Sequence, residues 1–187
     1  MNEFRNFLKI VDEKGQSVLW FGITGSWRKT NEQIEREVRE IVGQIMQRGN
    51  GIVSGGALNV DYFATDEALK LNPAADRIKI FLPASLPLYA AHYRKRAEEG
   101  VITMQQAEDL ILQLTQIRKA NPNSLITHPT NTVMNPTTYF ERNTEVVTAS
   151  DALIAFQVNE SEGVADTVAK AKAQSKPVLM KKYTIED

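Results

Sequence analysis

The chain has 187 residues, 42% of them hydrophobic and 24% charged, so it is long enough to bury a core of ordinary globular size. Its 22 Lys and Arg residues nearly balance 23 Asp and Glu residues, which excludes the strongly basic composition of a dedicated polyanion binder. Cysteine is absent, which excludes disulfides, thiolate metal sites and thiol chemistry. No apolar run approaches the roughly 18 residues of a membrane span and no signal peptide is visible, so we expect a single cytoplasmic domain over 1–187.

Apolar runs and glycine turns predict the first elements in chain order. Residues 1–17 are expected to form an N-terminal extension or a hairpin, with an apolar run at 7–11. The nearly continuous apolar run at 18–24 is typical of a strand covered on both faces. Apolar side chains at spacings of four, three and four residues then predict an amphipathic helix over 31–48.

The same order of strand, glycine turn and helix follows again. Residues 51–54 predict a very short strand, and two glycines separate it from a helix over 60–71 that Asn59 is placed to cap. A third strand is expected over 77–82 and ends at a proline.

Residues 86–137 predict an insertion on the core. Its first part is expected to be helical up to Ala120, in two pieces broken at Gly100. The proline-rich remainder, 121–137, predicts an ordered loop around a short strand at 124–127. The second helical piece carries an apolar face formed by Met104, Ala107, Ile111 and Leu114.

The C-terminal part predicts a helix over 138–149, a strand over 151–158, a helix over 164–174 and a last strand over 177–180. Strands that alternate with helices predict an α/β fold with right-handed crossovers. An eight-stranded barrel usually needs about 250 residues. We therefore expect an open, doubly wound, mostly parallel sheet of the Rossmann-like type, with helices on both faces.

In such sheets ligands bind beyond the carboxyl ends of the strands, so the turns that follow the strands are the candidate sites. In the first turn Gly25 allows close backbone approach, Ser26 offers a hydroxyl and Arg28 a cation, just before a helix begins. This set suits a phosphate, and the alternative is an ordinary turn. Trp27 either stacks on a base or packs against the sheet edge.

The second turn begins at Ser54. Its two glycines, Gly55 and Gly56, allow backbone amides to form an anion-binding nest. Asp61 is able to accept hydrogen bonds from sugar hydroxyls; the alternative is a first-turn carboxylate favoured by the helix dipole.

A third turn has Gly163 at a helix start, with Asp166 and Thr167 nearby. Arg142 and Asn143 lie in the helix that leads into the strand at 151–158. For these two, the alternative to a ligand site is a solvated helix face.

Four segments resemble, in order, the Rossmann-like core of the DNA-processing protein A (DprA/Smf) family. More broadly they resemble the superfamily that holds the "lonely guy" and lysine-decarboxylase-like nucleotide hydrolases. The segments are GITGSWRKT at 22–30, IVSGGALNVDYFATDEAL at 52–69, YFERNTEVVTASDALIAF at 139–156 and SEGVADTVAKAKAQSKPV at 161–178.

The resemblance implies that the three turns and the Arg-Asn pair gather around a nucleotide phosphate. Carried over residue by residue, it nominates Gly25, Ser26, Arg28, Ser54, Gly55, Gly56, Asp61, Arg142, Asn143, Gly163 and Thr167. No cofactor or metal site is expected, since the two histidines have no second ligand at a recognisable spacing.

Three positions depart from the patterns of the resembled families. Leu58 and Asn59 stand where DprA-like chains carry Arg-Gly, and Thr65 stands where they carry a histidine. The missing cation weakens the implication of single-stranded DNA binding. Thr167 stands where the lonely-guy hydrolases carry their catalytic glutamate, so phosphoribohydrolase activity does not follow by analogy.

The main expectation is a binding module for a nucleotide or nucleotide-derived phosphate, because no activated nucleophile or clear acid/base pair is visible. One alternative is a nucleotide N-glycosidic hydrolase or transferase, with Asp61, Glu141 and Asp166 as candidate catalytic carboxylates. The other is single-stranded DNA binding in DNA processing. The resemblance also implies a homodimer, for which Met104, Ile111 and Leu114 offer an interface unless they are core residues.

Overall fold

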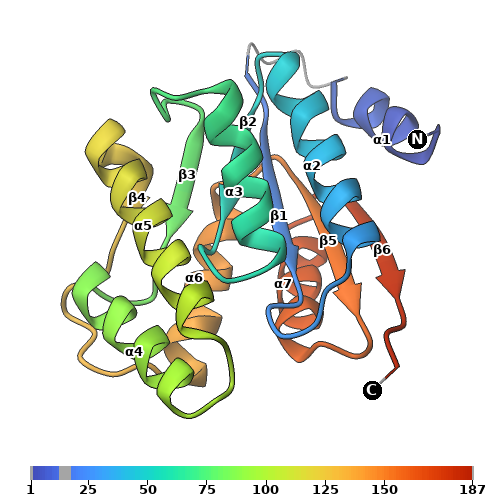
Figure 1. Ribbon diagram of the computed structural model, residues 1–187. Coiled ribbons are helices and arrows are strands. Elements are labelled where there is room, and N and C mark those ends of the chain that lie inside the picture. Colours follow the sequence, from blue (N-terminus) through green and yellow to red (C-terminus); the bar gives the residue numbers. More distant parts are fainter. Residues whose placement is uncertain (1, 13–17, 187) are drawn as a thin grey trace.

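The computed structural model describes residues 2–12 and 18–186, and within them one six-stranded parallel sheet has the order β4-β3-β2-β1-β5-β6 (Figure 1). The strands are β1 (Trp20–Gly25), β2 (Gly51–Ser54), β3 (Ile78–Phe81), β4 (Leu125–Ile126), β5 (Ala152–Val158) and β6 (Val178–Tyr183). The helices are α1 (Asn2–Asp12), α2 (Glu32–Gln47), α3 (Val60–Leu71), α4 (Leu86–Glu98), α5 (Met104–Ala120), α6 (Pro136–Thr148) and α7 (Glu162–Ala173), with a short 3-10 turn, η1 (Pro122–Ser124). The predicted open, doubly wound Rossmann-like sheet is confirmed.

The order in which the chain adds strands to the sheet reverses at β1. From β1 the chain proceeds through β2, β3 and β4 to one edge, whereas β5 and β6 lie on the other side of β1. Figure 1 shows α2 and α3 in front of the sheet and α6 and α7 behind it. Because the crossovers from β1 and β5 leave in opposite directions, a crevice opens at the carboxyl ends of these two neighbouring strands.

The central strands are apolar because both of their faces are covered. Phe21 and Ile23 of β1 are fully buried, as are Ile154 and Phe156 of β5. The predicted amphipathic helix is α2, which begins after Asn31, whose side chain accepts a hydrogen bond from the amide of Ile34. This packing holds the ends of β1 and β5 rigidly.

The N-terminal hairpin alternative is wrong, because residues 2–12 form the helix α1. Phe4, Phe7, Leu8 and Val11 are buried in the main core, and their spacing of three, one and three residues marks one helical face. The run at 7–11 was thus part of a longer helical pattern. Residues 13–17, the rest of the predicted extension or hairpin, lie outside the described residues.

Residues 86–137 are integrated into the sheet and the core, whereas the prediction was an insertion on the core. β4 extends the sheet by pairing with β3, and α4 and α5 are separated near Gly100, as predicted. The buried face of α5 differs from the predicted one: Ala107, Leu110, Leu114 and Ile117 are fully buried, whereas Met104 is 47% exposed and Ile111 half-buried. None of the described helices is long and apolar enough to cross a membrane.

Candidate functional site

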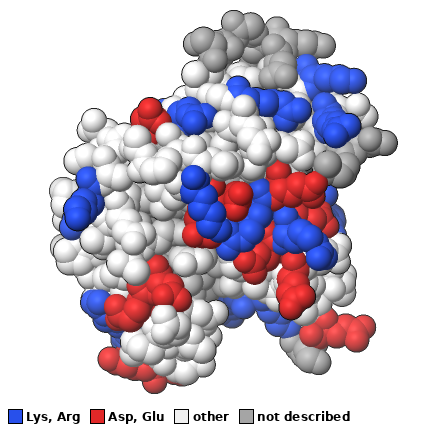
Figure 2. Space-filling model, turned by 45° about the horizontal axis from the view of Figure 1, so that its top comes forward, with Lys and Arg blue, Asp and Glu red and all other residues white. Residues whose placement is uncertain are grey.

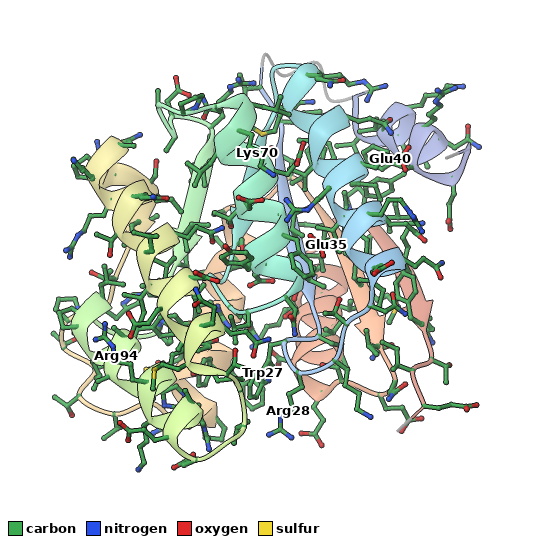
Figure 3. All side chains as sticks on the ribbon, viewed as in Figure 1. Trp27, Arg28, Glu35, Glu40, Lys70 and Arg94 are labelled. Carbon is green, nitrogen blue, oxygen red and sulfur yellow. The ribbon has the colours of Figure 1, made fainter. Side chains whose placement is uncertain are left out.

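A pocket of about 760 Å³ opens at the carboxyl edge of the sheet, where the loops after β1, β2 and β5 meet α4 and α6. Trp27 and Arg28 mark this edge in Figure 3. Most of the nominated residues line the pocket: Gly25, Ser26, Arg28, Gly55, Asp61, Arg142, Asn143, Gly163 and Thr167. Four other candidates do not line it: Ser54, Gly56, Glu141 and Asp166. Residues of all three turns therefore lie together at this edge of the sheet.

The first turn is tied to β5 through Ser26. Its hydroxyl accepts a hydrogen bond from the amide of Val158 (2.9 Å) and lies 3.3 Å from the carbonyl oxygen of the same residue. The Ser26 side chain thus fixes the turn. Arg28 is exposed at the mouth of the pocket, with its guanidinium carbon 4.9 Å from the ring centroid of Trp27.

The second turn does not offer the open anion nest that its glycines predicted. Asp61 Oδ2 accepts hydrogen bonds from the amides of Gly55 (3.1 Å) and Ala57 (3.3 Å). The amide of Gly56 donates to Ser54 Oγ (3.2 Å). These three amides are therefore occupied by the protein's own side chains.

Asn59 also has a different role from the predicted one. It stands at the N-cap position of α3, but its side chain makes no capping hydrogen bond. Its Nδ2 atom instead donates to the carbonyl oxygen of Trp27 (2.6 Å). Asn59 therefore joins the first turn to the second.

Asp61 is a buried carboxyl group, 5% exposed, at the floor of the pocket. Burial raises its pKa, while the charge of Arg142 and the hydrogen bonds from Ala57, Ser54 and Gly55 oppose that rise. Asp61 is the only one of the three candidate catalytic carboxylates that lines the pocket. Its contacts make it an organiser of the second turn.

Arg142 is a buried cation, 7% exposed, and not part of a solvated helix face. Its Nη1 atom donates to the carbonyl oxygen of Gly55, and Nε donates to Asn143 Oδ1 (3.2 Å). Nη2 makes no hydrogen bond to the described part of the chain. Because the guanidinium lines the pocket, this nitrogen is a donor available to a ligand.

The remaining nominated side chains have partners within the protein. Asn143 Nδ2 donates to Asp166 Oδ2 (3.0 Å), and Lys170 forms an ion pair with the same carboxylate (2.7 Å). Thr167 Oγ1 donates to the carbonyl oxygen of Gly163 (2.8 Å). Gly163 itself is exposed at the start of α7 with open space around its Cα.

Aromatic side chains of α4 and α6 form a wall of the pocket that sequence reasoning missed. His92 and Tyr93 come from α4, and Tyr139 comes from α6. Burial raises the pKa of both tyrosines and lowers the pKa of His92, the latter with help from the nearby charge of Arg96. The only available signal was the four-residue spacing of Tyr89 and Tyr93, which places both on one helix face.

The family comparison covers nearly the whole chain. A family model described as DNA recombination-mediator protein A matches residues 14–187. Among curated proteins, no match was found.

Several solved structures share the fold. DNA processing protein A from Helicobacter pylori, studied for its single-stranded DNA binding mode, is 20% identical with a TM-score of 0.64, over 87% of this chain and 64% of that one. The molybdenum cofactor binding protein of Rippkaea orientalis is 16% identical with a TM-score of 0.58, over 90% and 78% of the two chains. The molybdenum cofactor carrier protein of Chlamydomonas reinhardtii is 17% identical with a TM-score of 0.51, over 87% and 75%. The chain spans less than two thirds of the H. pylori protein.

Proposed function

We propose that this chain, which belongs to the DNA recombination-mediator protein A family, binds a nucleotide or nucleotide-derived phosphate in the pocket at the carboxyl edge of its sheet. The observation that carries the proposal is the guanidinium of Arg142. It is buried in the pocket wall, it is held by Gly55 and Asn143, and its Nη2 atom has no partner in the described residues. A held guanidinium with a spare donor is suited to a phosphate oxygen.

Two further groups support a phosphate seat beside Arg142. Arg28 supplies an exposed cation at the mouth of the pocket. At the start of α7 the side chain of Ser161 makes no capping hydrogen bond, and Glu162, Gly163 and Val164 of the first turn line the pocket, where a helix N-terminus favours an anion. The seat thus comprises side-chain cations and a helix start, with no contribution from the filled nest of the second turn.

The aromatic wall supports a base next to that seat. Trp27, Tyr93 and Tyr139 all line the pocket, and flat rings of this kind stack on nucleobases. The volume of about 760 Å³ lies within the range of roughly 300–1,000 Å³ that is common for small-molecule sites. A mononucleotide therefore matches the pocket in size, charge and surface.

A thermal-shift panel tests the proposal. Nucleoside mono-, di- and triphosphates are compared with the matching nucleosides and with inorganic phosphate. At about 100 times Kd, a ligand adds ~2.7 kcal/mol to stability, which corresponds to a rise in Tm of about 5–10 °C for a chain of this size. No shift with any phosphate compound contradicts binding. Chromatographic release of free base in the same samples would instead establish the N-glycosidic alternative, with Asp61 as its candidate carboxylate.

Single-stranded DNA is the second candidate ligand, and family membership favours it. The H. pylori relative is described as a single-stranded DNA binder, which supports the same ligand here. Figure 2, which brings the edge opposite the pocket forward, shows Lys and Arg interleaved with Asp and Glu. The charges visible in this view therefore alternate in sign and form no continuous basic track.

Oligo-dT mobility distinguishes the two ligands. Retarded migration at low salt that is lost at moderate salt supports the DNA candidate, because affinity for a strand falls with salt in proportion to the phosphates contacted. An unretarded strand combined with a nucleotide thermal shift supports the small-molecule proposal.

A further inference from the structure

We propose that two carboxylates on the loop between β5 and α7, Glu160 and Glu162, act as an acidic lip that selects a mononucleotide over a continuing strand. The inference rests on the proposed function, since it names the ligand length that the same pocket prefers. Both residues line the pocket and both are exposed. The acidic lip therefore lies where the ligand would enter or leave.

In the described part of the chain, the two carboxylates of the lip have no ion-pair partner. Neither Glu160 nor Glu162 makes an ion pair or a side-chain hydrogen bond within the described ranges 2–12 and 18–186. Several acidic residues elsewhere form ion pairs, such as Glu37 with Lys181 and Glu108 with Arg94. What distinguishes Glu160 and Glu162 is their place in the pocket lining, beside the proposed phosphate seat.

One of the two has a structural reason to be acidic, and the other has none. Glu162 lies in the first turn of α7, where a carboxylate is favoured by the helix dipole. Glu160 precedes the helix and gains little from that dipole. Its position in the pocket lining is thus the sharper indication of a selective role.

The cations of the pocket attract the phosphate of a ligand, whereas the acidic lip repels it. A mononucleotide presents its phosphate to Arg28 and Arg142 and carries no further phosphates along a chain. A strand adds one charge with every nucleotide, and charges within about 8–10 Å of each other are poorly screened at physiological salt. The extra phosphates of a strand that leaves the pocket past this loop would be repelled by Glu160 and Glu162.

Charge-neutral, nearly isosteric variants test the lip. Binding of dTMP and of oligo-dT is measured by fluorescence titration for the wild type, Glu160→Gln and the double variant Glu160→Gln/Glu162→Gln. The matched control is Glu40→Gln, an exposed position on α2 that Figure 3 places far from Trp27 and Arg28. We expect Glu160→Gln to bind oligo-dT about fivefold more tightly and the double variant on the order of tenfold or more, with a smaller change for dTMP.

The outcomes separate this inference from the proposed function. A gain in oligo-dT affinity that Glu40→Gln does not share supports the lip, and misfolding cannot produce such a gain. Unchanged oligo-dT affinity in Glu160→Gln, an equal gain in Glu40→Gln, or an equal gain for dTMP each overturns it. If the wild type binds neither dTMP nor oligo-dT, the proposed function fails, and the lip survives only if oligo-dT binds to the double variant.

Discussion

The carbonyl oxygen of Gly55 accepts a hydrogen bond from Nη1 of Arg142, and the guanidinium occupies the space that a side chain at position 55 would need. The two residues are 87 positions apart in the chain. Gly55 follows β2 and Arg142 lies on α6, so this contact joins the helix behind the sheet to the loop at the carboxyl end of β2. The glycine is required for the placement of the cation.

Gly55→Ala is expected to displace Arg142. A Cβ at this position overlaps the guanidinium, and overpacking of this kind costs about 1–3 kcal/mol. Tm should fall by roughly 2–12 °C, at about 2–4 °C per kcal/mol for a chain of this length. Differential scanning calorimetry measures the change. Gly163→Ala is the control, because open space surrounds that glycine and little change is expected beyond helix propensity.

Arg142 and Asp61 should be energetically coupled. Removal of Arg142 takes away the positive charge that favours ionised Asp61 and leaves the carbonyl oxygen of Gly55 without its donor, at a cost of about 1–3 kcal/mol. In an Asp61→Asn background the same removal should cost less, by about 0.5–3 kcal/mol. Urea unfolding of the two single variants and the double variant gives the coupling free energy. Strict additivity would show that the two charges do not interact.

The raised pKa of Asp61 predicts the sign of a pH effect. The ordinary pKa of an aspartate is 3.8, so as the pH rises above that value Asp61 loses its proton first in the unfolded chain. This favours unfolding until the carboxyl group of the folded chain also ionises. The unfolding free energy of the wild type minus that of Asp61→Asn should therefore fall as the pH rises from about 3. Glu37 and Asp66, whose pKa values are lowered by their partners, affect both proteins equally. A difference that rises with pH contradicts the prediction.

Tyr89 is expected to support the pocket from behind. Its hydroxyl donates to the carbonyl oxygen of Gly56 (3.1 Å) and lies 3.4 Å from the hydroxyl of Tyr93. Tyr89→Phe removes this hydrogen bond and leaves a buried carbonyl oxygen without that donor, at a cost of about 1–3 kcal/mol. Chemical denaturation measures the loss. His92→Phe on the same helix, which is half-buried and donates no hydrogen bond within the described residues, should cost less.

The fold was predictable because its signals are local. β2 and α3 begin and end at the predicted residues, because glycines and an apolar run mark the limits of both elements in the sequence. α1 was missed because only its last apolar residues were read as a run, and Phe4 completes the helical spacing. The buried face of α5 also differs from the predicted one, because packing against η1 and β4 decides which of its residues point inward.

The site was predictable in position but not in detail. Turns after parallel strands meet at one edge, so their convergence follows from the topology. The occupation of the Gly55 and Ala57 amides by Asp61 has no sequence signature, because a first-turn carboxylate satisfies several patterns equally. The burial of Arg142 depends on the missing side chain of Gly55, a pairing that one sequence does not reveal.

The most direct test of the central claim is nucleotide affinity by isothermal titration calorimetry for the wild type, Arg28→Ala and Arg94→Ala. Arg28 is exposed at the pocket, whereas Arg94 is exposed on α4, outside the lining, and pairs with Glu108 (2.7 Å) (Figure 3). The expected result is a loss of about 10-fold or more for Arg28→Ala, the usual size for a charge-assisted contact, with unchanged Tm and with Arg94→Ala equal to the wild type. Wild-type affinity in Arg28→Ala, or an equal loss in both variants, would contradict a phosphate seat at this edge of the sheet.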